Sequence, residues 1–275
     1  MATVSSKPLA VVTGASSGIG FELARQFVKH GYDLLIVAED TGIHDAATKL
    51  HAEGGNVHSI RCDLATHDGV EALCAEMKAM GRPVDAVAIN AGVGVGGEFV
   101  KTDLAAELKM VHLNVVGVVH LAKRVAVDMV ARRQGKILIT SSIAATMPGP
   151  YEAVYAATKA FDLSFAEALR NELKGCGVTV TALMPGPTET NFFHRAGLDD
   201  TKVGVGKKDS AADVARDGFE ALMAGKDKVV AGSIKNRIVT LANDVLPDPI
   251  KAERHAKMAQ PGSGKKAQEK QTKSQ

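Results

Sequence analysis

A glycine-rich turn near the N-terminus is the feature that most constrains the fold of this chain. Residues 9–12 form an apolar run rich in β-branched side chains, which predicts a buried strand, and residues 21–28 have the amphipathic spacing of a helix. Between them stands Thr13-Gly14-Ala15-Ser16-Ser17-Gly18-Ile19-Gly20. A strand, a glycine-rich turn and a helix start together form an anion site, because the free N–H groups of the first helical turn face a phosphate. This segment therefore predicts an α/β fold with a phosphate-binding edge.

Strands and helices alternate along the rest of the chain. Apolar runs near residues 9–13, 33–38, 56–61, 84–89, 135–141, 177–183 and 227–231 predict strands, and long helices are expected near 104–133 and 151–174. Such alternation favours a single parallel sheet with helices on both faces. We assign residues 1–250 to one α/β domain on this basis.

A second motif stands far from the first in the sequence. It reads Tyr155-Ala156-Ala157-Thr158-Lys159, and Ser142 lies thirteen residues before the tyrosine. Residues four apart share one face of a helix, so the Tyr155 phenol and the Lys159 ammonium can point into one pocket. A nearby cation lowers the pKa of a tyrosine, and the Ser142 hydroxyl could hold a substrate oxygen while Tyr155 protonates it. The alternative is an exposed helix with a solvated lysine.

In combination, these motifs resemble the classical short-chain dehydrogenases/reductases over roughly residues 8–235. The resemblance implies a doubly wound, Rossmann-type sheet with the strand order 3-2-1-4-5-6-7 and a site at the carboxyl ends of the strands. It also implies a catalytic set of Ser142, Tyr155 and Lys159, in which Tyr155 is the general acid/base and Lys159 contacts the nicotinamide ribose. Asn114 matches the asparagine that anchors a proton-relay water.

The same resemblance implies which residues bind the cofactor. The glycine-rich turn would hold the pyrophosphate, Asp63-Leu64 the adenine, and Asn90-Ala91-Gly92 would line the cofactor along the sheet. Residues after the sixth strand would bind the nicotinamide carboxamide. The expected cofactor residues are Gly14, Ser16, Ser17, Gly18, Ile19, Gly20, Glu39, Asp63, Leu64, Asn90, Ala91, Gly92, Tyr155, Lys159, Pro185, Gly186, Thr188 and Thr190.

The choice between NAD and NADP depends on the end of the second strand. Ala38 and Glu39 match neither family pattern, because NADP enzymes tend to carry arginine at the second position and NAD enzymes aspartate at the first. A 2′-phosphate would meet Glu39 and Asp40 with no cation expected in reach. Glu39 could instead accept hydrogen bonds from the ribose hydroxyls. We expect NAD, with NADP left open.

The predicted activity is hydride transfer between a nicotinamide cofactor and a secondary alcohol or ketone. The alternative is a nucleotide-binding redox sensor on the same fold without turnover. The presence of the serine, the tyrosine and the lysine together favours the enzyme. The residues after Ser142, among them Ile143, Ala144 and Met147, predict a mostly apolar substrate wall.

Composition narrows the partners and the compartment. A net charge of +2 indicates no nucleic-acid or membrane partner. The three cysteines, Cys62, Cys74 and Cys176, lack metal-ligand spacing, so no metal site is expected, and their odd number suits a reducing cytoplasm. Residues 1–7 contain no apolar signal core. The apolar stretch 111–130 is interrupted by polar residues, which predicts a buried or interface helix and not a membrane span. The family resemblance implies a homotetramer or homodimer formed through the two long helices, and this segment fits that expectation.

Two segments are expected to lie outside the sheet. Residues 191–210 predict a substrate lid, in which Phe192 and Phe193 either close over an apolar substrate or serve as packing residues. Residues 260–275 are rich in glycine, lysine and glutamine without an apolar period, which predicts a disordered tail.

Overall fold

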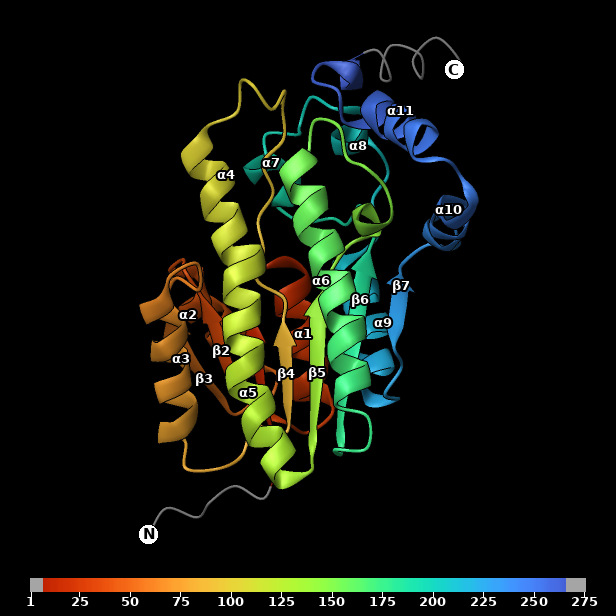
Figure 1. The fold of residues 1–275 in the computed structure, drawn as a ribbon. Helices are drawn as coiled ribbons and strands as arrows, with labels where there is room; N and C mark the ends of the chain where they lie inside the picture. The colour runs from red at the N-terminus through yellow and green to blue at the C-terminus, as the bar shows by residue number, and fades with distance from the viewer. Residues whose placement is uncertain (1–6, 266–275) are drawn as a thin grey trace.

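The computed structural model describes residues 7–265 of the chain. Its sheet consists of β1 (Leu9–Thr13), β2 (Asp33–Ala38), β3 (Val57–Arg61), β4 (Ala86–Ile89), β5 (Gly135–Thr140), β6 (Val178–Pro185) and β7 (Lys228–Ala231). The order is β3-β2-β1-β4-β5-β6-β7, and every neighbouring pair is parallel (Figure 1). Fold class and strand order are confirmed, and each predicted strand is present.

Helices cover both faces of the sheet (Figure 1). On one face lie α1 (Gly18–Lys29), α2 (Gly42–Ala52) and α9 (Ala211–Met223), and on the other lie α3 (His67–Ala79), α5 (Val118–Arg132) and α6 (Ala153–Glu172). Successive side chains of a strand point to opposite faces, so Leu9 and Val11 pack with α3 and α5 while Ala10 and Val12 pack with α1 and α9. A sheet buried on both faces explains why its strands are continuous apolar runs.

The helix predicted over 104–133 contains a local change of winding. It consists of α4 (Leu104–Val111), a π-helical turn over His112–Gly117, and α5. Asn114 lies in this turn and is fully buried. Its carboxamide accepts a hydrogen bond from Val93 N (3.0 Å) and donates to Val93 O (2.9 Å) and Thr158 Oγ1 (3.1 Å). Because buried amides need partners, these bonds hold the turn against the loop after β4.

The same stretch, Leu104–Arg132, is the one helix among residues 7–265 whose length and apolar composition would allow it to cross a membrane. In this fold α5 packs against α3 and the central strands, and α4 packs against α6. Those contacts fit the predicted buried or interface helix.

The segment after β7 forms two helices that were not predicted from the sequence. These are α10 (Ile234–Val245) and α11 (Asp248–Ala259), and α11 packs against the short α8 (Lys202–Val205) above the carboxyl ends of the strands (Figure 1).

The predicted disordered tail is wrong at its start. Gly264 N donates to Asp200 O (2.8 Å), Gly262 N donates to Asp200 Oδ2 (2.9 Å), and Ser263 Oγ accepts from Lys202 N (2.8 Å). Residues 260–265 are therefore tied to the predicted lid. The rest of the predicted tail, residues 266–275, lies outside the described residues.

Candidate active site

A cavity of about 700 Å³ opens at the carboxyl ends of the strands. It is lined by all but one of the predicted site residues: Gly14, Ser16, Ser17, Gly18, Ile19, Gly20, Glu39, Asp63, Leu64, Asn90, Ala91, Gly92, Ser142, Tyr155, Lys159, Pro185, Gly186, Thr188 and Thr190. The exception is Asn114, which lies behind the wall. A methyl group on Gly92 would lie 3.3 Å from both Asn114 Oδ1 and Lys159 Nζ, so the asparagine and the lysine approach the same glycine.

The glycine-rich turn has the shape that a pyrophosphate site requires. Gly14 and Gly18 have positive φ angles of 67° and 59°, which glycine adopts readily. A side-chain carbon at Gly20 would lie 2.1 Å from Gly14 O, so only glycine allows helix α1 to start this close to the turn. The bare backbone and the N-terminus of α1 together fit an anionic group at this edge of the cavity.

Threonine and asparagine side chains fix this turn on the sheet. Thr13 Oγ1 accepts hydrogen bonds from the backbone N–H groups of Asn90 and Ala91, each at 2.9 Å. Asn90 Nδ2 in turn donates to Thr13 O (3.1 Å), and its Oδ1 accepts from Thr140 Oγ1 (3.2 Å). The ends of β1, β4 and β5 are thereby held in one arrangement.

The ribose end of the cavity differs from the sequence expectation. Lys109 of α4 places its Nζ 2.8 Å from Glu39 Oε2 and 3.6 Å from Asp63 Oδ2. The expectation that no cation reaches Glu39 is therefore wrong, because the long helix brings a lysine from seventy residues away. Asp40 is held by Ser16, whose Oγ donates to Asp40 Oδ2 at 2.8 Å.

Ser142 and Tyr155 meet at the other end of the cavity. Ser142 Oγ accepts from Ala144 N (3.1 Å) and donates to Pro185 O (3.4 Å). The Ser142 side chain also lies close enough to the Tyr155 phenol to lower its pKa slightly against the larger opposing effects. The Phe192 ring lies over the phenol, with 5.2 Å between ring centroids. Burial, followed by the nearby Glu152, raises the pKa of Tyr155 well above its usual value.

The sequence predicts that Lys159 lowers the pKa of Tyr155, but in this structure the pKa of Tyr155 is raised. Lys159 Nζ donates to Thr140 O (2.9 Å) and to Asp162 Oδ2 (3.0 Å), and both side chains of this ion pair are buried. The lysine charge is thus balanced by a carboxylate one helical turn further along α6. Asp162 itself raises the pKa of Tyr155, and its Oδ1 has no hydrogen-bond partner among the described residues.

Glu152 and His255 form a second buried pair at the substrate end. Glu152 Oε2 lies 3.5 Å from His255 Nε2, and His255 Nδ1 lies 3.1 Å from Pro150 O. Burial raises the pKa of Glu152 to about 7 and lowers the pKa of His255. Both pKa shifts favour the uncharged forms. Near pH 7 the pair is therefore often a neutral carboxylic acid beside a neutral imidazole, and a permanent ion pair is disfavoured.

Sequence reasoning missed four side chains at or beside the cavity: Lys109, Glu152, Asp162 and His255. Glu152 stands three residues before Tyr155 and Asp162 three after Lys159, so helical spacing could have placed both beside the predicted set. Lys109 and His255 come from distant elements, and no local pattern marks them.

The predicted lid contains the short helices α7 (Phe192–Arg195) and α8. Its two phenylalanines have different surroundings, because Phe192 faces Tyr155 whereas Phe193 is buried with Ala196 and Leu198. His194 pairs with Asp199 at 2.7 Å and is exposed.

The fold and this cavity define an α/β protein with a glycine-rich, anion-binding edge beside a serine and a tyrosine that are partly buried and a lysine that is buried. Residues 8–200 match the family model described as short chain dehydrogenase. The chain belongs to the short-chain dehydrogenase/reductase family, as its motifs predicted. Membership places it among oxidoreductases that use nicotinamide cofactors.

Individual relatives agree with this assignment. "Probable oxidoreductase EphD" of Mycobacterium tuberculosis is 33% identical over 202 residues, which cover 71% of this chain and 34% of that protein. The chain thus spans about a third of the length of that relative. A short-chain dehydrogenase from Sphingobium yanoikuyae in complex with NADPH has a TM-score of 0.77 at 28% identity, covering 86% of this chain and 93% of that one. A family member from Burkholderia phymatum in complex with NAD has a TM-score of 0.74 at 25% identity, covering 86% and 91%.

Proposed function

We propose that the chain transfers a hydride between a nicotinamide cofactor and a secondary alcohol or ketone, with Tyr155 as the general acid/base. The observation that carries this proposal is that the glycine-rich turn, Ser142 and Tyr155 line one cavity. A cofactor bound along the turn supplies the hydride. The chain supplies the proton, the alignment and the exclusion of water.

The roles of the side chains follow from their contacts. Tyr155 and Ser142 line the same end of the cavity, so a carbonyl oxygen placed between them would accept from both hydroxyls. The raised pKa keeps Tyr155 protonated at neutral pH, which suits proton donation to a carbonyl and therefore the reductive direction. Lys159 and Asn114 both approach Gly92, which supports a proton path from Tyr155 past Lys159 towards Asn114.

The substrate end of the cavity indicates a substrate with both apolar and polar parts. Ile143, Ala144 and Met147 supply apolar surface, as predicted, and Phe192 supports a lid that closes over Tyr155. Helix α11 adds Lys251, Arg254 and His255 to the opposite side. We therefore propose a ketone of moderate size that carries a polar group away from the reacting carbon.

Replacing Tyr155 with phenylalanine tests the proposed proton donor. Tyr155→Phe removes the hydroxyl but keeps the ring against Phe192, so we expect turnover of ketones to fall at least ~100-fold, the usual scale of general acid catalysis. NADH affinity, measured by nicotinamide fluorescence, should change little. Retained turnover in this variant would contradict the role of Tyr155. A wild-type chain that binds cofactor but turns over no ketone or alcohol would instead favour the redox sensor.

Replacing Asp162 with asparagine tests the charge balance around Lys159. In Asp162→Asn the carboxylate that raises the pKa of Tyr155 and neutralises Lys159 is gone, so the pKa of Tyr155 should fall. The pH at which alcohol oxidation reaches half of its maximal kcat/KM should then move down by roughly one pH unit or more. Asp128→Asn, at an exposed aspartate paired with Arg132, is the matched control and should leave the profile in place. An unshifted profile in Asp162→Asn would show that Lys159 does not act on Tyr155.

We propose NAD as the preferred cofactor. The Glu39 carboxylate lines the cavity and pairs with Lys109, so a carboxylate already offsets the lysine charge that a 2′-phosphate would need. The solved relatives bind NADPH in one case and NAD in the other, so both cofactors remain within reach of the fold.

The Glu39–Lys109 pair gives a test of this preference. In Glu39→Ala the lysine is released, and we expect the affinity for NADPH relative to NADH to rise by roughly tenfold. Adding Lys109→Ala to this variant should remove the gain, because the lysine released from Glu39 is then absent. Fluorescence titration with both reduced cofactors measures the ratio. A wild-type preference for NADPH, or an equal ratio in all three proteins, would overturn the assignment.

We propose that the chain assembles as a homodimer or homotetramer through its long helices. Large apolar side chains are exposed along α4 and α5 and on α6: Leu104, Leu108, Val116, Val119, Val127 and Phe161. On α5 and the turn before it, Val116, Val119 and Val127 recur at helical spacing and so share one face. A second copy of this surface would cover it.

Sedimentation velocity checks this assembly. Val119→Asp should reduce the sedimenting mass towards that of one chain, because a buried unpaired carboxylate opposes association. Ile238→Asp, at an exposed apolar residue of α10, is the control and should keep the wild-type mass. A monomeric wild-type chain would contradict the proposal.

We also propose a cytoplasmic location, which cell fractionation would test. Its support is chemical: the three cysteines are unpaired, and burial raises the pKa values of Cys62 and Cys74 to about 11, so both stay thiols.

A further inference from the structure

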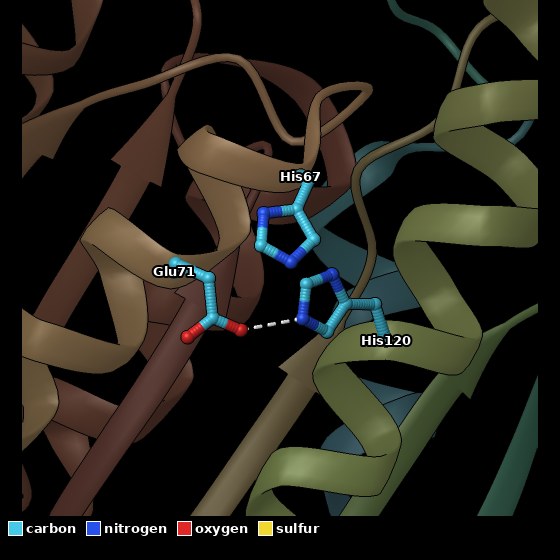
Figure 2. Close-up of side chains that lie close together, drawn as sticks. All are labelled: His67, Glu71 and His120. Carbon is cyan, nitrogen blue, oxygen red and sulfur yellow. Dashed lines mark hydrogen bonds and ion pairs between the residues drawn. The ribbon is translucent and has the colours of Figure 1, made fainter.

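Two histidines and a glutamate meet between α3 and α5, outside the cavity. His67 and Glu71 stand four residues apart on α3 and therefore share a face, and His120 projects towards them from α5 (Figure 2). Each offers one ligand atom, and these atoms lie within 4.8 Å of one another. The His67 and His120 rings are 5.0 Å apart between centroids, and His120 Nε2 lies 2.6 Å from Glu71 Oε1.

We propose that His67, Glu71 and His120 bind a divalent transition-metal cation, with Zn²⁺ as the best match. Two imidazoles and one carboxylate are a ligand set that zinc accepts, with water completing the tetrahedron. Magnesium and calcium prefer all-oxygen sites, so the two imidazoles select against them.

The observed positions need only small side-chain movements to accept the ion. Ligands at about 2.0–2.1 Å from a tetrahedral zinc are roughly 3.3 Å from each other. The 2.6 Å contact between Glu71 and His120 must therefore open by roughly 0.7 Å, and the His67 ring must move closer. His67 is mostly exposed at 74% of its side-chain surface, and Glu71 is about one-third exposed, so both can rotate without disturbing the core.

Arg124 is the group that opposes the ion. Its Nη2 lies 2.6 Å and its Nε 2.8 Å from the same Glu71 Oε1 that faces His120. The guanidinium thus occupies the carboxylate oxygen nearest the two imidazoles. The ion must either bind through the second oxygen or displace Arg124, which predicts that Arg124 weakens the site.

The location makes this a structural site, separate from the proposed chemistry. Thr66, which caps α3, donates through its Oγ1 to Asp63 O at 2.8 Å, and a side chain at Gly117 would lie 2.4 Å from Leu64 O. The ion would therefore join α3 and α5 directly behind the predicted adenine wall. None of the three ligands is among the described residues that line the cavity.

The site is tested by treating the full chain with a chelator and titrating it with ZnCl₂ while the heat of binding is measured by calorimetry. We expect one Zn²⁺ per chain and a higher Tm in its presence, because an ion that binds only the folded state stabilises it. His67→Ala, at an exposed side chain, should weaken binding at least about tenfold by removing one of three ligands. Arg124→Gln should tighten binding several-fold.

The structure offers a matched control at a second histidine that pairs with a glutamate of the same helix. His58 of β3 pairs with Glu76 of α3 at 2.8 Å, a histidine–glutamate pair of similar exposure that is not part of the three-residue cluster. His58→Ala should leave zinc affinity and the Tm increase unchanged. Wild-type affinity in His67→Ala, an equal loss in His58→Ala, or no saturable zinc binding by the wild-type chain would overturn the proposal. None of these measurements depends on turnover, so the zinc site is tested independently of the proposed oxidoreductase activity.

Discussion

The hydrogen bonds between Thr13 and the Asn90–Ala91 backbone are the constraint on which the site depends. They join the carboxyl ends of β1 and β4 at the point where the strand order reverses, and parallel α/β sheets bind ligands at that crevice. Gly14 and Gly20 pack against this junction too closely for any side chain. The junction therefore sets where helix α1 begins and where the bare backbone faces an anion. Thr140, the last residue of β5, donates a hydrogen bond to Asn90 and so joins β5 to the same network. Ser142 follows two residues later in the chain.

A second constraint is electrostatic. A lysine buried beside a tyrosine would normally make the phenol more acidic, but Asp162 pairs with Lys159 inside the protein. The negative charge of Asp162 offsets the positive charge of Lys159, and the carboxylate itself raises the pKa of Tyr155. Together with Glu152, it holds Tyr155 in its protonated form. The balance of charge around the tyrosine therefore depends on residues outside the motif that identifies it.

The sequence was sufficient for the sheet and the cofactor edge because both depend on local patterns. Apolar runs located all seven strands, and short glycine and asparagine motifs follow the strands that position them. It was insufficient where distant segments meet. Lys109 reaches Glu39 only because the helix from Leu104 to Arg132 crosses the sheet, and the π-helical turn at Asn114 has no sequence signature. Helices α10 and α11 were not predicted either, and α11 likewise packs against a segment distant in the sequence, the short helix α8.

The two ends of the cavity therefore differ in how they are encoded. The cofactor end is built from backbone and from residues close to their own strands, so sequence motifs locate it almost completely. The substrate end is built from α6, the segment after β6, and α11, which meet only in the folded chain. Glu152 and His255 illustrate the consequence: neither belongs to a motif, yet burial brings the pKa of Glu152 to about 7 beside the reacting centre. Under the proposed function, selectivity for the substrate then depends on these tertiary contacts.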